Sequence, residues 1–340
     1  MVTISDIAKK ANVSITTVSR ALNNYPDIKL KTKEKVLTIA REMGYFPNAN
    51  AKGLKTKNNW LVGILFTESL DIGLEHPLYA GVIESFKRTI SDHGYDTIFI
   101  TSNIGKKKTN YLNHCIYRNV NGVFVCTYTG LDPMLKELLE SDIKCVTTDI
   151  EYNQNVPIIL SDNISGIELA YDYLYNMGHR KIAFLSGPLN TLSGRERLEG
   201  YKKALETRKQ VFKEYFVAYA NDYDVVSGRT TCGKLLDQCS HDMPTAIISA
   251  SDILAIGAIN EMESRGITVP DDISIIGFDD IEIARYVKPA LTTIRQDRKK
   301  LGKVIADTLV AYINQEEVSS RTLIPVTLVE RDTCIPPSKN

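Results

Sequence analysis

From Trp60 onward, short apolar runs alternate with longer segments of helical periodicity, and this alternation is the feature that most restricts the fold. The first series contains LVGILF, DTIFIT, GVFVC and KCVTTD, and a second series contains KIAFLSG, TAIIS and ISIIGFD. Such runs are typical of parallel strands that are buried on both faces. Helices are expected near residues 77–92, 107–117, 132–140, 163–177, 192–208, 225–238 and 252–265. Two successive series predict two doubly wound α/β subdomains, each with a parallel sheet between helices.

Polar residues directly follow several of these runs, where a core role does not explain them. In open α/β sheets, ligands bind beyond the carboxyl ends of the strands, so a cleft between the two subdomains is the expected site. Arg195 and Arg197 lie at a helix start after a strand, and Arg197 is placed to reach the same cleft. For Asp149 a simple turn cap is the alternative. The polar residues at strand ends are Asp149, Ser251, Asp252, Asp279 and Asp280.

Charge is distributed unevenly along a chain whose net charge is zero. Residues 1–58 hold eleven basic and four acidic residues, a net charge of +7, so the remaining 282 of the 340 residues carry −7. A basic segment on an acidic body suggests a polyanionic partner for that segment alone. A solvated charged surface is the alternative.

The first 45 residues predict three short helices. The first is expected to have Ser5 as its N-cap and an apolar stripe at Ile7, Ala8 and Ala11, before a turn at Asn12. The second is expected to begin at Ser14 and to bury Val18, Ala21 and Leu22, and the third is expected to run from about Thr32 to Gly44. Two short helices joined by a tight turn match the helix-turn-helix pattern, in which the second helix enters the major groove of DNA.

The second helix carries an apolar residue on its polar face. This face lies opposite the apolar stripe that the helix is expected to bury, and Ile15 shares it with Thr16, Ser19, Arg20 and Asn23. In the major groove Ile15 can contact thymine methyl groups, while Thr16 and Arg20 read donors and acceptors on the bases. Short polar side chains suited to phosphate oxygens are Ser14, Thr17, Ser19 and Asn23.

The segment YFPNANAKGLKTKNN offers few residues to bury, because only Ala49, Ala51 and Leu54 are apolar between Lys52, Lys55 and Lys57. A short helix of this kind is marginal without tertiary contacts. One interpretation is a segment that orders on DNA, with lysines on phosphates and Leu54 as a wedge in the minor groove. The other is a plain basic linker.

The motif TISDIAKKANVSITTVSRALNN, followed by T-x-E-K-V and GYFPNANAKGLKTKN, resembles the LacI/GalR family of bacterial transcription repressors, and the likeness extends over essentially the whole chain. The resemblance implies a homodimer that reads two half-sites of operator DNA while paired hinge helices open the central base step. It also implies a periplasmic-binding-protein-like effector domain. The DNA contacts that it implies are Thr3, Ile4, Ser14, Ile15, Thr16, Thr17, Ser19, Arg20, Asn23, Thr32, Tyr45, Asn48, Ala51, Lys52, Leu54 and Lys55.

The resemblance also implies a set of effector contacts. Carboxylates with one arginine and one aromatic ring suit a polyhydroxylated ligand, so a sugar or sugar phosphate is the expected effector. Thr191 stands where purine-responsive relatives place an arginine, which counts against a purine. The implied effector contacts are Leu78, Tyr79, Asp149, Ser193, Arg197, Tyr223, Ser251, Asp279 and Gln296.

The expected domains are a helix-turn-helix unit at residues 1–45, a hinge at 46–59 and an effector-binding and dimerisation domain at 60–334. Within the last, one subdomain is expected at about 60–158 and 295–321 and the other at about 159–291 and 322–334. No leucine heptad follows the last strand-like run, so a dimer is the expected limit of assembly.

The sequence disfavours several other classes of protein. It has no secretory leader and no apolar run of the length that a membrane span requires, so a cytoplasmic location is expected. The cysteines lack CxxC spacing, and Cys126 and Cys145 lie in strand-like runs, so structural zinc is not expected. The segment SGPLNTLSG has neither the GxGxxG pattern nor a P-loop lysine, and no cofactor is expected. The five histidines are scattered, and no catalytic constellation emerges. The alternatives left open are a solute-binding protein of the same architecture, a protein-interaction scaffold and, least favoured, an enzyme.

Overall fold

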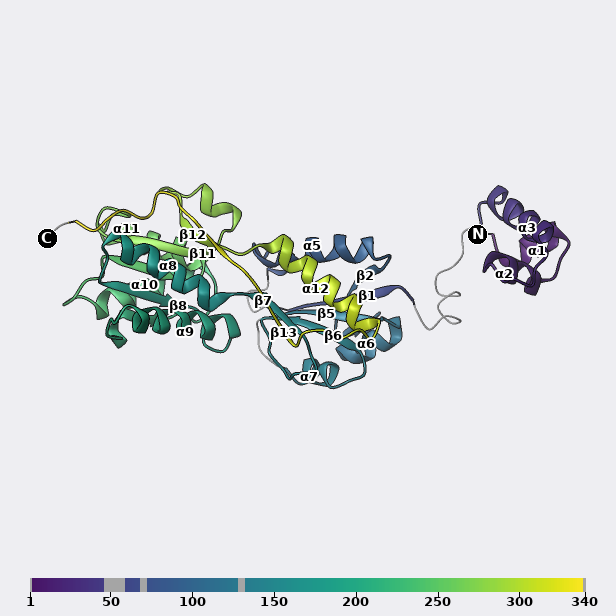
Figure 1. The fold of residues 1–340 in the computed structure, drawn as a ribbon, viewed down its shortest axis with the longest axis horizontal. Coiled ribbons are helices and arrows are strands. Elements are labelled where there is room, and N and C mark those ends of the chain that lie inside the picture. Colours follow the sequence, from purple (N-terminus) through teal and green to yellow (C-terminus); the bar gives the residue numbers. More distant parts are fainter. Residues whose placement is uncertain (1, 46–58, 68–71, 128–131, 339–340) are drawn as a thin grey trace. The chain divides into compact units, whose positions relative to one another are not determined.

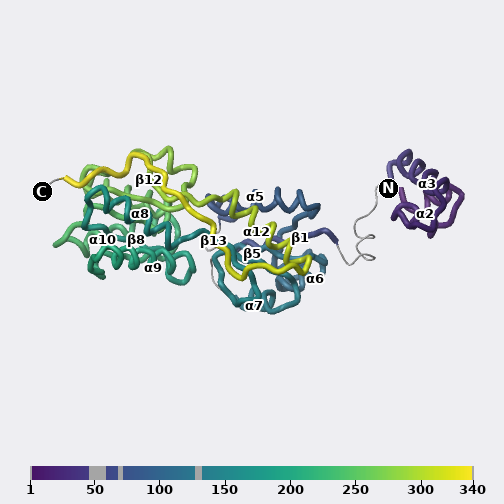
Figure 2. Tube along the Cα trace, in the orientation of Figure 1, coloured from purple at the N-terminus to yellow at the C-terminus, as the bar shows by residue number. Residues whose placement is uncertain are grey.

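The computed structural model describes residues 2–45, 59–67, 72–127 and 132–338. The chain divides into two compact units, residues 1–59 and residues 60–340, here called the head and the body. Figure 1 shows the helical head and the two α/β subdomains of the body. The trace in Figure 2 follows the path of the chain between the two subdomains.

The head contains three helices around a small apolar core. They are α1 (Ile4–Ala11), α2 (Ile15–Leu22) and α3 (Leu30–Glu42). The core residues are Ile7, Ala8, Ala11, Val18, Ala21, Val36 and Ala40. The predicted apolar stripes of the first two helices are therefore confirmed, with Leu22 only partly buried beside them. Asn12 ends α1 in the left-handed conformation (φ 54°), which turns the chain toward α2.

Two helix starts in the head differ from the sequence prediction. Thr3, not Ser5, is the N-cap of α1, because its hydroxyl and the Asp6 carboxylate form a reciprocal capping box. The third helix begins at Leu30 rather than near Thr32, and its N-cap Lys29 provides no side-chain hydrogen bond. Ser14 caps α2 as predicted, since its hydroxyl accepts a hydrogen bond from the amide of Thr17 at 3.0 Å.

The first subdomain of the body is built on a six-stranded parallel sheet in the order β13-β7-β6-β5-β1-β2. Its strands are β1 (Leu61–Thr67), β2 (Asp96–Phe99), β5 (Gly122–Thr127), β6 (Lys144–Thr148), β7 (Ile158–Ser161) and β13 (Arg321–Ile324). Apolar residues of α5 (Tyr79–Asp92) and α12 (Arg298–Ile313) form one core against this sheet. Those of α6 (Tyr111–Arg118) and α7 (Pro133–Leu139) form another, which includes Cys145.

Part of the predicted helix at 107–117 is instead a small hairpin. Strands β3 (Asn103–Ile104) and β4 (Lys107–Lys108) pair antiparallel, and Gly105 at φ 58° provides the turn. Helix α6 therefore starts at Tyr111, where the Asn110 side chain caps it. Apolar periodicity alone did not separate this hairpin from the helix that follows.

The second subdomain contains a six-stranded sheet in the order β14-β12-β11-β10-β8-β9, parallel except for β14. Its strands are β8 (Ile182–Ser186), β9 (Val217–Tyr219), β10 (Ala246–Ser249), β11 (Ser274–Asp279), β12 (Thr292–Arg295) and β14 (Thr327–Val329). Its helices are α8 (Asn163–Met177), α9 (Leu192–Thr207), α10 (Val225–Gln238) and α11 (Asp252–Ser264). It also contains the short 3-10 helices η2 (Glu214–Phe216) and η3 (Glu282–Arg285), whereas η1 (Gly73–Glu75) precedes α5 in the first subdomain. Helix α8 packs beside α9, and α10 beside α11.

The chain passes between the two sheets three times. It leaves the first sheet after β7, returns after β12 and crosses again between β13 and β14. The predicted boundary at 158–159 falls inside β7, and the one at 321–322 falls inside β13. The observed boundaries lie closer to the C-terminus than the predicted ones, because β7 and β13 pair along their whole length before the chain crosses to the other subdomain. Residues 292–294 belong to the second subdomain because they pair with β11.

Candidate ligand-binding cavity and nucleic-acid interface

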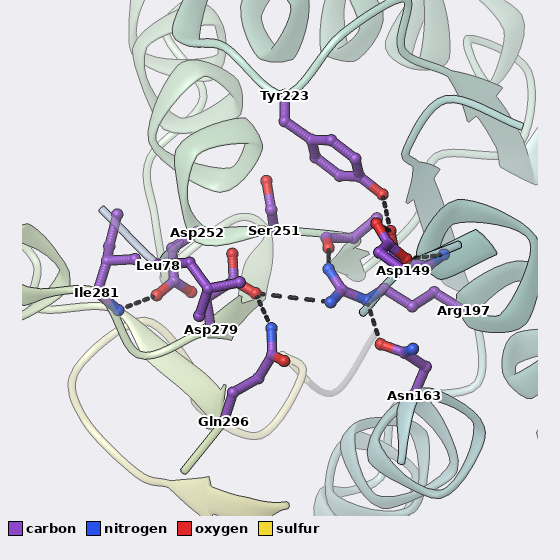
Figure 3. A network of polar contacts seen from close by, with 12 residues as sticks. Leu78, Asp149, Asn163, Arg197, Tyr223, Ser251, Asp252, Asp279, Ile281 and Gln296 are labelled. Atoms are coloured by element: carbon purple, nitrogen blue, oxygen red, sulfur yellow. Dashed lines mark hydrogen bonds and ion pairs between the residues drawn. The ribbon is translucent and has the colours of Figure 1, made fainter. Parts of the chain in front are cut away.

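A cavity of about 370 Å³ lies between the two subdomains of the body. Its walls include the carboxyl ends of β6 and β11 and the first turns of α5, α9, α10 and α11. All nine effector contacts that the sequence resemblance implied line this one cavity: Leu78, Tyr79, Asp149, Ser193, Arg197, Tyr223, Ser251, Asp279 and Gln296. Figure 3 shows most of these side chains around Arg197.

Asp149 links the two subdomains across the cavity. It follows β6 in the left-handed conformation (φ 61°), and its carboxylate accepts hydrogen bonds from the Ser193 amide at 2.8 Å and the Ser193 hydroxyl at 3.1 Å. The Tyr79 hydroxyl lies 3.5 Å from the same carboxylate. Burial raises the pKa of Asp149 to about 6, against the opposing effects of Arg197 and Ser193. The carboxylate thus occupies the amino end of α9, where an acceptor is favoured.

Arg197 is held from several directions. Its Nε donates to Asn163 Oδ1 at 2.9 Å, its Nη1 donates to the Ala250 carbonyl, and its Nη2 lies 3.6 Å from Asp279. The guanidinium also lies 3.9 Å above the ring of Phe278. Because a guanidinium has five N–H donors, these contacts fix its orientation and still leave donors for a ligand. The prediction that Arg197 reaches the cleft is confirmed.

Arg195 differs from its neighbour two residues away. It is exposed, and its side chain donates to the Leu189 carbonyl at 3.1 Å on the outside of α9. The helical turn therefore directs Arg197 inward and Arg195 away from the cavity.

The polar residues at strand ends divide into two groups. Asp279 lines the cavity at φ 121° and accepts a hydrogen bond from Gln296 Nε2 at 2.6 Å. Burial raises the pKa of Asp279 to about 6, although Arg197 and Gln296 act to lower it. Ser251 also lines the cavity, and its hydroxyl caps α11 by accepting from the Leu254 amide at 3.2 Å.

Asp252 and Asp280 serve the scaffold instead of the cavity. Asp252 is fully buried, accepts hydrogen bonds from Thr293 and from the Ile281 amide, and so ties α11 to the segments after β11 and in β12. Burial and the charge of Asp279 raise the pKa of Asp252 well above its ordinary value. Asp280 forms ion pairs with Arg295 and Arg331. The expectation that all strand-end carboxylates face the cleft is therefore wrong for these two.

Several lining residues were missed by the sequence analysis. Ser161 is the last residue of β7 and Asn163 is the first residue of α8; the end of this short strand was not recognised, so the carboxyl-end rule was not applied to them. His76 precedes α5, and its Nδ1 accepts from the amides of Leu78 and Tyr79, both at 3.3 Å. The remaining polar residues are Thr148, the last residue of β6, and Asp224, the N-cap of α10.

The surface of α2 in the head has the exposure that the sequence predicted. Ile15 is 55% exposed although it is one of the most apolar residues of this helix. Arg20 on the same helix forms an ion pair with Asp27 and stacks over Tyr25 with the guanidinium carbon 5.3 Å from the ring centre. A base contact by Arg20 therefore requires exchange of these intramolecular contacts.

The other predicted DNA contacts in the head have local roles as well. The Ser14 and Thr17 hydroxyls lie 2.8 Å apart, and the side-chain Nδ2 of Asn23 donates to the Ser19 carbonyl at 2.7 Å. Exposed or half-buried positions in the described part of the head also include Thr3, Ile4, Thr16, Thr32 and Tyr45. Five predicted contacts lie outside the described residues: Asn48, Ala51, Lys52, Leu54 and Lys55.

Metal binding and membrane insertion find no support among the described residues. Within ranges 2–45, 59–67, 72–127 and 132–338, no group of His, Cys, Asp or Glu side chains is arranged to hold a metal ion. Every helix in the same ranges is too short or too polar to span a lipid bilayer.

Family comparisons agree with both units of the structure. Residues 3–48 match the model for bacterial regulatory proteins of the lacI family, and residues 171–334 match a periplasmic binding protein-like domain. The chain is 36% identical over 330 residues to the probable HTH-type transcriptional repressor ExuR of Bacillus subtilis, covering 96% of each chain. It is 33% identical over 323 residues to catabolite control protein A of Priestia megaterium, covering 94% of this chain and 95% of that one.

Solved structures give the same result. The lac repressor dimer bound to operator and the anti-inducer ONPF matches with a TM-score of 0.80 and 29% identity, over 98% of this chain and 99% of that chain. The complex of the transcriptional regulator CelR with cellobiose matches with a TM-score of 0.71 and 27% identity, over 98% and 100% of the two chains. The combination of an exposed helix-turn-helix face, a cavity between two α/β subdomains and full-length relatives places the chain in the LacI family of bacterial regulatory proteins.

Proposed function

We propose that this protein is a transcriptional repressor that binds operator DNA as a homodimer and whose operator affinity is set by a carbohydrate bound between the two subdomains of the body. The observation that carries the proposal is the convergence of all nine expected effector contacts on one cavity. The relatives named repressors, the lac repressor bound to operator and CelR bound to cellobiose support the same role. The role places the protein in the cytoplasm beside the chromosome and involves no catalysis.

The polar side chains of the cavity suit a ligand rich in hydroxyl groups. Asp149 and Asp279 accept hydrogen bonds from hydroxyls, and the unused N–H groups of Arg197 donate to sugar oxygens. Tyr223, whose hydroxyl lies 3.3 Å from the Ser193 hydroxyl, offers a ring to the apolar face of a sugar. A ligand held by these residues contacts both subdomains at once, since Asp149 belongs to the first and Arg197 and Asp279 belong to the second.

Helix α9 provides a route by which the ligand affects the arrangement of the subdomains. Ser193 at its first turn bonds Asp149 of the first subdomain, and Glu196 one turn further forms an ion pair with Arg321 of β13. Glu196 also accepts from Asn163 at 2.8 Å, and Asn163 in turn accepts from Arg197. A ligand that moves Arg197 or Asp149 therefore changes contacts between the subdomains, which gives it differential affinity for two arrangements of the body.

The proposed role in the head rests on Ile15 and its polar neighbours. An apolar side chain that is exposed on a helix gains free energy only when a partner covers it, and thymine methyl groups in the major groove provide such a partner. The predicted hinge, residues 46–59, would transmit the state of the body to the head. Its predicted DNA contacts, Ala51, Lys52, Leu54 and Lys55, are part of the proposal.

Selection from a pool of random duplexes tests the proposal and identifies the operator sequence in the same experiment. The full-length protein is expected to enrich a pseudo-palindromic sequence, because a two-fold symmetric dimer reads two half-sites. A screen of neutral and anionic sugars by thermal unfolding, with and without the selected duplex, is expected to reveal ligands that stabilise the two states unequally. Failure to enrich any sequence at low salt would contradict the proposed DNA-binding function.

The alternative of a solute-binding protein makes a different prediction for the same experiment. Such a protein would bind a sugar without enriching any duplex. The variant Ile15→Ala provides the matched control, because it removes the exposed contact in the head and leaves the cavity unchanged. It is expected to lose the enrichment and to retain the sugar response.

A further inference from the structure

Acidic side chains outnumber basic ones among the residues that line the cavity. Its described lining contains three carboxylates, Asp149, Asp224 and Asp279, and one cationic side chain, Arg197. Arg197 is already 3.6 Å from Asp279. The two internal segments of the body that lie outside the described residues, 68–71 and 128–131, contain no lysine or arginine.

The other titratable and charged neighbours do not reverse this balance. His76 accepts two backbone N–H groups at Nδ1, an arrangement that requires an unprotonated Nδ1. Arg298 is not among the lining residues: its guanidinium donates to the Pro77 carbonyl at 3.2 Å, and its charge acts together with Arg197 to lower the pKa of Asp279, which still leaves three carboxylates against two arginines. A ligand in the cavity therefore meets an excess of negative charge on the described side chains.

Helix amino ends are the usual places where phosphates and carboxylates bind, because several N–H groups point outward there. At this cavity each such end already has an acceptor from the protein. Asp149 accepts from the first turn of α9, Asp224 accepts from the Ser227 amide at the start of α10 at 2.6 Å, and Ser251 caps α11. The His76 ring accepts from the amides that begin α5. These acceptors take up part of the N–H groups that would otherwise favour an anion, and three of the four helix ends carry an acceptor that is itself a carboxylate or lies beside one.

The same groups are well suited to hydroxyl donors. A carboxylate only accepts hydrogen bonds, so a hydroxyl can donate to it without displacing an existing amide, because each oxygen has two acceptor positions. The Ser161 hydroxyl is also available: it is buried, it lines the cavity, and no hydrogen-bond partner for it occurs among the described residues. A buried hydroxyl without a partner is costly, so a ligand oxygen that bonds it gains affinity.

We propose that the cavity selects an uncharged, hydroxyl-rich sugar and discriminates against the phosphorylated or carboxylated form of the same sugar. This inference rests on the proposed function and narrows its effector, since sequence analysis left sugar and sugar phosphate equally open. A unit charge about 8 Å from a carboxylate, at an effective dielectric constant near 20, weakens binding by roughly thirtyfold. The anionic form of a sugar that binds is therefore expected to have a dissociation constant at least about thirtyfold higher.

Calorimetric titration of the full-length protein with matched pairs of sugars tests this at pH 7.5. The pairs are D-ribose with D-ribose 5-phosphate, D-glucose with D-glucose 6-phosphate and D-glucuronate, D-galactose with D-galacturonate, and cellobiose with cellobionate. An anionic form that binds as tightly as its neutral partner, or more tightly, overturns the inference. If no sugar of either charge binds, the carbohydrate-gated function itself is refuted, whereas operator binding by the head is measured separately by selection.

Charge-removing variants separate electrostatic exclusion from a simple lack of space. Asp149→Asn is expected to weaken the binding of the neutral sugar and to lower the ratio of the anionic to the neutral dissociation constant by up to about thirtyfold, because one repulsive charge is gone. Asp271→Asn removes an exposed carboxylate of the second subdomain and serves as the matched control, with both constants unchanged. An unchanged ratio in Asp149→Asn would show that size and not charge excludes the anion, and would overturn the inference.

Discussion

Replacing Asp149 by asparagine is expected to stabilise the body at neutral pH while it weakens the sugar response. Burial raises the pKa of Asp149 from 3.8 to about 6. Between these two pH values the folded protein keeps the proton while the unfolded chain loses it, so the stability due to this group falls as pH rises. Above pH 6 the Asp149 carboxyl is ionised in both the folded and the unfolded protein, and burying its charge lowers the free energy of unfolding by about 3 kcal/mol.

Asparagine has the shape of the protonated side chain and does not titrate. Its carbonyl can accept the Ser193 amide hydrogen bond, and its NH₂ group can donate to the Ser193 hydroxyl, so both contacts with α9 are retained. The variant is therefore expected to match the wild type near pH 4 and to exceed it by up to about 3 kcal/mol at pH 7.5. Stability gained at the expense of function is common for residues in binding sites.

Urea unfolding followed by tryptophan fluorescence measures this difference. Trp60 is the single tryptophan of the chain, belongs to the body and contacts the ring of Tyr95 at a tilted angle, with ring centres 5.0 Å apart, so its emission reports the body and not the head. Other buried carboxylates titrate in both proteins and cancel in the comparison. A stability difference that stays constant between pH 4 and pH 7.5 would refute the reasoning.

Three further substitutions test separate parts of the account. Thr3→Ala removes the capping box with Asp6 and is expected to cost about 1 kcal/mol, read as faster hydrogen exchange of the α1 amides. Arg20→Ala is expected to relax base choice at one position of each half-site, read by repeating the duplex selection, with little loss of head stability because its ion pair is exposed. Arg321→Met breaks the ion pair with Glu196 and is expected to bring the factor by which sugar changes operator affinity from about five or more toward one, measured by fluorescence anisotropy.

The Arg321 variant has a close control in an arginine at the other end of α9, the helix that carries Glu196. Arg208, the C-cap residue of α9, pairs with Asp172 at 2.7 Å within one subdomain, and its side chain is 30% exposed against 35% for Arg321. Arg208→Met should leave the sugar response of operator binding unchanged. If sugar changes operator affinity by the same factor in Arg321→Met and Arg208→Met, the ion pair between the subdomains does not couple sugar binding to DNA binding.

Local sequence signals were sufficient where a residue's role depends on its own strand or helix. Asp149 and Asp279 follow long apolar runs, and the carboxyl-end rule led directly to the cavity. The exposed Ile15 was evident from helical periodicity alone. The resemblance to a known family added Leu78 and Gln296, whose positions depend on the packing of both subdomains.

Features that depend on pairing between distant segments were not predictable in the same way. Strands β7 and β12 are four residues each and carry no turn signal that marks their ends, so the crossings between subdomains were placed about three residues too early. The inward and outward roles of Asp279 and Asp280 are set by the arginines from β12 and the C-terminal segment, which sequence analysis did not place beside them. The choice of Thr3 over Ser5 as cap depended on the reciprocal bond of Asp6.

The central claim is that sugar binding in the cavity and DNA binding by the head are thermodynamically coupled. Its most direct test measures four dissociation constants with the selected duplex and the tightest-binding neutral sugar: each ligand alone and each in the presence of the other. Linkage requires the sugar to change duplex affinity by the same factor by which the duplex changes sugar affinity, and a factor of about five or more is expected. If sugar and duplex both bind but neither changes the dissociation constant of the other, the claim is contradicted.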